Sequence, residues 1–258
     1  MTNFISDYIK RELKAGRNFT CLFVGRPGTG KTYSAIRLCE QVDSNFTSKS
    51  IVFKVEDLLD LVKNSSKGDA ILFDEAAIAA SNRQSYMNKY NKAFSFLLQT
   101  FRHRQIVLVA TMPDLRFLDA GCRRLFNALF ESKKVRLKMK KCDVQPKLIE
   151  NNPQTGKEYY KYPRTKSGAV VTLIQFGKPH AKILKPYERR KHKFTKELYD
   201  ETLLSLQDEP KPKGDGDEER RCPDCKTLGR WYPSLKKLGC LKCGSKWERV
   251  CDQKDASV

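Results

Sequence analysis

The chain of 258 residues lacks any apolar run long enough to cross a bilayer. Its longest apolar stretches, such as Ile106 to Ala110, have the length of a strand, whereas a spanning helix needs about 20 residues. Charged side chains interrupt the segment from Met1 to Lys14, which predicts an amphipathic helix and not a signal peptide. We therefore expect a cytoplasmic protein without a membrane span.

Acidic side chains are also scarce relative to basic ones. The 30 Asp and Glu residues face 50 Lys and Arg residues, which gives a formal net charge of +20. This excess predicts a polyanionic partner, either nucleic acid or an anionic membrane surface. Four cysteines stand alone, without the spacing of disulfide partners, as expected in a reducing cytoplasm. They are Cys21, Cys39, Cys122 and Cys142.

Residues 1–132 alternate strand-like apolar runs with helical stripes, the pattern of a parallel sheet with crossover helices. We predict an α/β core with helices over Lys31–Gln41 and Val55–Val62. The predicted strands are Phe19–Val24, Ser50–Phe53, Ala70–Asp74, Gln105–Ala110 and Asn127–Glu131.

The segment from Gly25 to Thr32 matches the phosphate-binding pattern G-x-x-x-x-G-K-[ST]. It follows a predicted strand and precedes a predicted helix, which gathers main-chain N–H groups around an anion. In this pattern the Lys31 side chain reaches the β- and γ-phosphates, and the Thr32 hydroxyl binds Mg²⁺. The sequence thus predicts an ATP and Mg²⁺ site at Gly25, Arg26, Pro27, Gly28, Thr29, Gly30, Lys31 and Thr32.

Two carboxylates, Asp74 and Glu75, end the predicted strand that begins at Ala70. A strand edge beside the phosphate loop aims Asp74 at the water shell of Mg²⁺, and Glu75 is the candidate to polarise the attacking water. The alternative for this pair alone is a strand that ends in solvated acids. Together with the loop, the pair favours an ATPase over a switch or a small-molecule kinase.

Three further candidate catalytic residues lie just before or just after the predicted strand Gln105–Ala110. Thr111, at its end, is placed to sense the γ-phosphate, although a Thr that merely ends a strand is an alternative. Arg102 and Arg104 are candidates for the arginine that one subunit supplies to its neighbour's active site. They could equally oppose the dipole of the preceding helix.

The residues Asp74-Glu75-Ala76, Phe101-Arg102-His103-Arg104 and Ile106 to Thr111 together resemble the zonular-occludens-toxin-like ATPases. These are grouped with the FtsK–HerA ATPases that pump DNA, and they include proteins of archaeal plasmids and viruses. The resemblance covers about residues 19–132 and implies a RecA-like core, a hexamer-type ring and movement of DNA. Thr111 stands where the family usually has Gln, which keeps AAA+-type helicase loaders as an alternative. The membrane helix of many toxin-like members is also missing.

The remainder of the chain changes in character after residue 132. Nineteen Lys or Arg and four Asp or Glu lie between Lys133 and Lys196. We expect a basic, β-rich extension packed on the core over residues 133–200, with strands over Val135–Lys140 and Ala169–Phe176 and a turn over Asn152–Gly156. Residues 201–220 are acidic and poor in apolar groups, which predicts a flexible linker.

Residues 221–251 carry two C-x-x-C pairs separated by fourteen residues. Four thiolates at this spacing can hold one Zn²⁺ tetrahedrally, which predicts a small zinc ribbon with ligands Cys222, Cys225, Cys240 and Cys243. Disulfides or an iron–sulfur site are the alternatives. The ribbon is basic and could contact nucleic acid or dock a protein.

Two functional hypotheses follow. The first is an oligomeric, Mg²⁺-dependent ATPase that binds or moves DNA during packaging, conjugation or replication of a mobile element. The second is a helicase loader or a nucleotide-dependent regulatory module that recruits a protein through its zinc ribbon.

Overall fold

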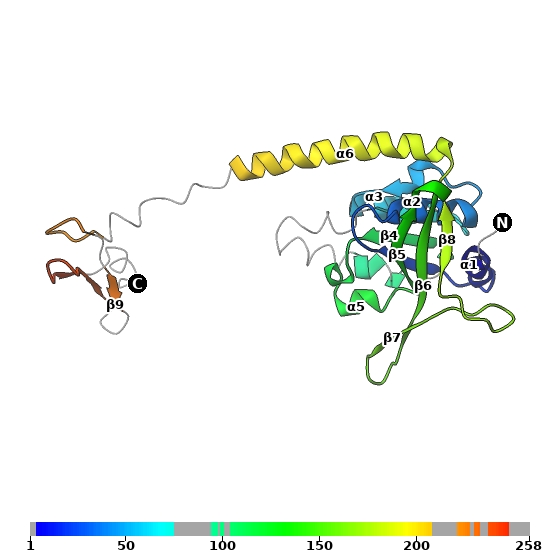
Figure 1. Ribbon diagram of the computed structural model, residues 1–258, viewed down its shortest axis with the longest axis horizontal. Coiled ribbons are helices and arrows are strands. Elements are labelled where there is room, and N and C mark those ends of the chain that lie inside the picture. Colours follow the sequence, from blue (N-terminus) through cyan, green and yellow to red (C-terminus); the bar gives the residue numbers. More distant parts are fainter. Residues whose placement is uncertain are drawn as a thin grey trace. The chain divides into compact units, whose positions relative to one another are not determined.

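The computed structural model describes residues 4–74, 94–97, 99–100, 104–207, 221–227, 230–232 and 237–247. The chain divides into two compact units, Met1–Thr195 and Lys196–Val258. The first unit is built on one eight-stranded sheet (Figure 1).

The sheet of the first unit has the order β2-β3-β4-β1-β5-β6-β7, and β8 also pairs with β6. The pairs among β1 to β5 are parallel, whereas β6 pairs antiparallel with β5, β7 and β8. The strands are β1 (Phe19–Val24), β2 (Ile51–Val52), β3 (Ala70–Phe73), β4 (Val107–Met112), β5 (Ala128–Arg136), β6 (Lys141–Asn151), β7 (Glu158–Lys161) and β8 (Ile174–Gly177). The result is the α/β fold with a mostly parallel central sheet that the sequence predicted.

Helices cover both faces of the sheet because its central strands are apolar on both sides. Every residue of β1 is buried: Phe19 and Phe23 belong to one core cluster, and Leu22 belongs to the other. The first cluster contains residues of α1 (Phe4–Lys14), α2 (Lys31–Val42) and α6 (Ala181–Gln207), and the second contains residues of α3 (Val55–Asn64). A short helix, α5 (Ala120–Arg123), precedes β5. None of the described helices combines the length and apolar content needed to span a bilayer.

The basic segment after residue 132 extends the sheet itself. The expected boundary at 132/133 lies inside β5, because Lys134 to Arg136 continue the pairing with β6. The expected strand Val135–Lys140 is wrong: β5 ends at Arg136, Leu137–Met139 form a 3-10 turn, and Lys140 has a positive φ of 51°. The alternation of apolar and basic residues here belongs to a hairpin tip, where Leu137 and Met139 are exposed.

Two other expectations for this region can be compared with the structure. The strand expected over Ala169–Phe176 is shortened to β8, although Val170 forms an isolated bridge with Arg164. The turn over Asn152–Gly156 is confirmed, since it joins β6 to β7.

The helix α6 was not predicted from the sequence. It has 27 residues and includes Glu201 to Gln207, which were expected to belong to a flexible linker. Its helical periodicity is weak because Pro186 lies within it and because few of its described side chains are buried, chiefly Leu184 and Tyr187. The rest of the expected linker, residues 208–220, lies outside the described residues.

The second unit contains a small three-stranded sheet of order β11-β10-β9. Its strands are β9 (Arg230–Tyr232), β10 (Lys237–Gly239) and β11 (Lys246–Trp247), and both pairings are antiparallel.

Candidate active site and cysteine cluster

The loop between β1 and α2 has the geometry of a phosphate cradle. Gly28 and Gly30 have φ values of +78° and +81°, which residues with a side chain rarely adopt. Gly30 caps α2 without a side-chain hydrogen bond, so the first N–H groups of the helix point to a site for an anion. Lys31 Nζ donates a hydrogen bond of 3.0 Å to the carbonyl of Arg26. The loop residues predicted from the sequence therefore form one cradle.

The end of β3 brings Asp74 to this loop. Its carboxylate is fully buried, and Oδ1 accepts hydrogen bonds of 2.9 Å from Thr32 Oγ1 and 2.7 Å from Thr111 Oγ1. These residues meet because β3 and β1 are both parallel neighbours of β4, so that their carboxyl ends share one edge of the sheet. A carboxylate and a hydroxyl side by side are suitable ligands for Mg²⁺ and its water shell.

The structure also brings to this site residues that the sequence analysis missed. The Tyr187 hydroxyl donates a hydrogen bond of 2.6 Å to Asp74 Oδ2, and Lys191 Nζ lies 3.1 Å from the same oxygen. Both belong to α6 and are four residues apart, which places them on one face of the helix. That spacing was the available signal, but it is informative only once the segment is known to be helical.

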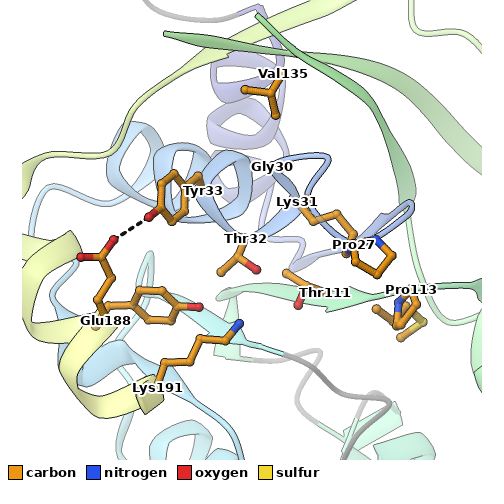
Figure 2. A pocket seen from close by; sticks show the side chains of 13 residues that line it. Pro27, Gly30, Lys31, Thr32, Tyr33, Thr111, Pro113, Val135, Glu188 and Lys191 are labelled. Carbon is orange, nitrogen blue, oxygen red and sulfur yellow. Dashed lines mark hydrogen bonds between the residues drawn. The ribbon is translucent and has the colours of Figure 1, made fainter. Parts of the chain in front are cut away.

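A cavity of about 610 Å³, within the size range of small-molecule sites, is lined by Thr32 and Thr111, whose hydroxyls are bonded to Asp74. Its walls come from the phosphate loop, the end of β4, the β5 strand and α6 (Figure 2). It is lined by Pro27, Gly28, Gly30, Lys31, Thr32, Tyr33, Thr111, Met112, Pro113, Val135, Tyr187, Glu188 and Lys191. The cavity thus adjoins the cradle where a nucleotide is expected.

The hairpin formed by β5 and β6 packs directly on the phosphate loop. Cys142 Sγ donates a hydrogen bond of 3.0 Å to the Thr29 carbonyl. A Cβ atom on Gly30 would lie 3.1 Å from both Cys142 Sγ and Val135 Cγ2. Burial raises the pKa of the Cys142 thiol, which keeps it protonated as a donor.

Three of the candidate catalytic residues lie apart from this cluster or outside the described part. Glu75 and Arg102 lie outside the described residues. Arg104 donates a hydrogen bond of 2.8 Å from Nη1 to the carbonyl of Lys63, at the C-terminal end of α3. Arg104 is not among the described residues that line the cavity.

Residues 21–133 match the model of the ATPase family associated with various cellular activities (AAA). This segment is an ATPase domain. The match ends within β5, so that most of the β5–β6 hairpin and all of α6 follow it. No curated protein sequence matches the chain.

Solved structures that resemble this chain include three further proteins. The N-terminal domain of zonular occludens toxin from Neisseria meningitidis is 18% identical, with a TM-score of 0.32, and the match covers 58% of this chain and 96% of that domain. A DNA polymerase III gamma subunit-related protein from Thermotoga maritima is 12% identical, with a TM-score of 0.39 and coverage of 52% and 47%. A point variant of RuvB from Thermotoga maritima is 17% identical, with a TM-score of 0.34 and coverage of 51% and 46%. The chain therefore spans nearly all of the toxin domain but about half of the other two proteins.

The four C-terminal cysteines form a separate cluster in the second unit. The sulfur atoms of Cys222, Cys225, Cys240 and Cys243 all lie within 4.8 Å of one another. Thiolates bound to one Zn²⁺ at about 2.3 Å in tetrahedral geometry are separated by similar distances, so the cluster fits this metal.

The two C-x-x-C segments share one backbone geometry. The N–H of Cys222 donates to Thr227 O at 2.8 Å, and the N–H of Cys240 donates to Ser245 O at 2.8 Å. The residues four positions after these cysteines, Lys226 and Gly244, both have positive φ. Hydrogen bonds with the side chain and backbone of Thr227 lower the pKa of Cys225 to about 6, which favours the thiolate form that binds metals.

Proposed function

We propose that this chain is an oligomeric ATPase that couples ATP hydrolysis to the binding or movement of DNA for a mobile element. The support for nucleotide chemistry is the arrangement of Lys31, Thr32 and Asp74 in one cluster at the start of α2. ATP and Mg²⁺ fit this cluster because a helix start and a lysine suit phosphates, and the hydroxyl–carboxylate pair suits Mg²⁺.

Each residue has a defined part in the proposed hydrolysis. The loop N–H groups and Lys31 would hold the phosphates, Thr32 and Asp74 would hold Mg²⁺ and its waters, and the bound metal would supply positive charge to the phosphates. Glu75, which follows Asp74 in the sequence, would accept a proton from the water that attacks the γ-phosphorus, while the bond from that phosphorus to the bridging oxygen breaks and ADP leaves. Thr111 acts through Asp74, since its hydroxyl is bonded to that carboxylate.

The single observation that supports coupling to DNA is the contact between the β5–β6 hairpin and the phosphate loop. The tip of this hairpin carries exposed cations. They include four lysines, Lys134, Lys138, Lys140 and Lys141. Cys142 is hydrogen-bonded to the Thr29 carbonyl, and Val135 lines the nucleotide cavity. A movement of the phosphate loop on hydrolysis would therefore also move the hairpin that carries these cations.

The test is DNA affinity measured at two salt concentrations by fluorescence anisotropy. Replacing these four lysines with Ala should weaken DNA binding. It should also reduce the slope of the logarithm of the association constant against the logarithm of the salt concentration, because fewer counterions are released. The matched control removes four exposed lysines elsewhere on the same unit: Lys49, Lys54, Lys63 and Lys67. Equal losses in the two variants would show that the hairpin has no special part in binding.

The ATPase rate distinguishes the two functional hypotheses. We expect stimulation by double-stranded DNA that weakens with salt, compared with single-stranded DNA and RNA. A slow rate that no nucleic acid changes would contradict coupling to DNA. It would favour the second hypothesis, in which a helicase loader or nucleotide-dependent module recruits a protein partner.

Ring assembly is a further part of the proposal. Arg102 or Arg104 of one subunit would complete the site of its neighbour, in a hexamer-type ring. Light scattering with a non-hydrolysable ATP analogue should give a mass several times that of the 29.7 kDa chain. A monomer under these conditions would exclude an arginine supplied between subunits.

We also propose that the cysteine cluster binds Zn²⁺ in a reducing cytoplasm and forms a basic zinc ribbon. The fit of four sulfur atoms within 4.8 Å supports the metal. The exposed Arg230, Lys242 and Lys246 support contact with nucleic acid.

A further inference from the structure

The helix α6 is firmly held against the ATPase domain where it passes the nucleotide cavity. Leu184 and Tyr187 are buried in the core, and the Phe194 ring stacks on Phe53 with centroids 4.9 Å apart. Glu188 accepts a hydrogen bond of 2.5 Å from the hydroxyl of Tyr33, the residue that follows Thr32. That bond raises the pKa of Tyr33 to about 12, so the tyrosine remains a donor at neutral pH.

This docking places a second lysine at the nucleotide cavity. Lys31 and Lys191 are the lysines among the described cavity residues, and they enter from different elements (Figure 2). Figure 2 shows Thr32 between the two lysine side chains. A phosphate chain that lies on Lys31 and extends past Thr32 would therefore approach Lys191.

Lys191 contacts the carboxylate that also serves the proposed Mg²⁺ site. Its Nζ lies 3.1 Å from Asp74 Oδ2, while Thr32 is bonded to Oδ1. A divalent cation at Thr32 and Asp74 would repel the ammonium group, and the phosphates of a nucleotide in the same cavity would offer it an anion. The lysine side chain has a flexible four-carbon stem, so Nζ can turn without movement of the helix.

We propose that Lys191 is a γ-phosphate ligand of the ATP site, supplied by α6 from the same chain. The inference rests on the proposed ATP and Mg²⁺ site. If it is correct, a residue of α6 distinguishes ATP from ADP, although α6 lies outside the segment that matches the family.

The experiment compares the affinities of the full chain for ADP and for a non-hydrolysable ATP analogue, both with Mg²⁺, by calorimetry. Lys191→Met keeps the length and apolar stem of the side chain and removes its charge. We expect about tenfold or greater loss of affinity for the ATP analogue, with little change for ADP, because a hydrogen bond to a charged group is lost. Lys191→Arg keeps the charge and should retain most of the wild-type affinity for the ATP analogue.

Two variants serve as controls. Lys185→Met removes an exposed lysine from the same helix and should leave both affinities unchanged. Lys31→Ala should abolish binding of both nucleotides. If the wild-type chain itself binds neither nucleotide, the proposed ATP site is wrong. If it binds both, and Lys191→Met does not selectively lower the affinity for the ATP analogue, only the role proposed for Lys191 is wrong.

A purely structural part for Lys191 predicts a different result. If the lysine only neutralises Asp74, Lys191→Met should change the affinities for ATP and ADP equally, and an increase in both would mean that Lys191 opposes the metal. Either result would overturn the proposal. Lys191→Gln keeps a donor for Asp74 without the charge, so it provides the same test if the Met variant does not fold.

Discussion

The Thr32 hydroxyl donates a hydrogen bond of 2.9 Å to Asp74 Oδ1 and so joins the phosphate loop to the end of β3. The same buried carboxylate accepts hydrogen bonds from Thr111 at the end of β4 and from Tyr187 in α6. One side chain thereby connects four elements of the first unit. Any change at Asp74 on nucleotide binding would reach each of these elements.

Glu75→Gln should separate nucleotide binding from hydrolysis. Gln keeps the size of the side chain but cannot accept the proton of the attacking water, so we expect the hydrolysis rate to fall by about 10² to 10⁴. Affinity for ATP should remain within a few-fold of the wild type. Lys31→Ala is the comparison, since it should lose both binding and hydrolysis. Normal turnover by the Gln variant would mean that another group is the base.

Thr111→Val tests whether Thr111 acts through Asp74. Val has nearly the same shape, but it removes the donor of the 2.7 Å hydrogen bond to Oδ1. We expect the Mg²⁺ concentration needed for half-maximal nucleotide binding to rise about 5- to 10-fold, with affinity in the absence of Mg²⁺ unchanged. Thr111→Ser should restore the wild-type value. A loss of affinity without Mg²⁺ would instead indicate direct contact with the phosphates.

Gly30→Ala and Gly28→Ala form a matched pair in the phosphate loop. Both positions have φ close to +80°, so the backbone strain of a new Cβ should be similar, about 1 kcal/mol. A Cβ on Gly28 meets nothing within 4 Å, whereas one on Gly30 meets Cys142 and Val135 at 3.1 Å. We therefore expect Gly30→Ala to cost about 1–3 kcal/mol more in urea unfolding. Equal costs would show that the hairpin does not press on the loop.

How much of this site could be predicted depended on the distance between its residues in the sequence. The phosphate loop is a run of consecutive residues, and Asp74 ends an apolar strand, so local patterns were sufficient. Lys191 joins Asp74 across 117 residues and lies in a helix whose pattern is obscured by Pro186. The hairpin tip was misread for a related reason: Leu137 and Met139 are apolar residues that are exposed, so they imitate the buried side of a strand.

The ion pair between Arg136 and Asp143, at 2.7 Å, should make the hairpin sensitive to acid. Burial alone would raise the pKa of Asp143, but hydrogen bonds from Gln175 and Arg136 outweigh it and hold the pKa below the usual value. A carboxyl with a lower pKa in the folded state stabilises the fold above its unfolded pKa of about 3.9, and this stability is lost as the pH falls through the folded value. Asp143→Asn should therefore reduce the loss of stability below pH 4, measured by urea unfolding at pH 5, 4 and 3. If the free energy of unfolding falls with pH equally in wild type and variant, this prediction is wrong. The control is Asp60→Asn, at an exposed position on α3.

Removal of metal should unfold the cysteine cluster without unfolding the ATPase domain. Small sites of this kind have little apolar core, so the metal provides most of their folding free energy. We expect the purified chain to contain one Zn²⁺ per molecule, and Cys222→Ser or a strong chelator to release it. Circular dichroism should then show that the main thermal transition is retained, with ATP affinity unchanged. Cys251→Ser, at a cysteine that is not one of the four predicted ligands, should keep the metal. A chain purified under reducing conditions that contains iron, or no metal, would contradict the assignment of zinc to these four thiolates.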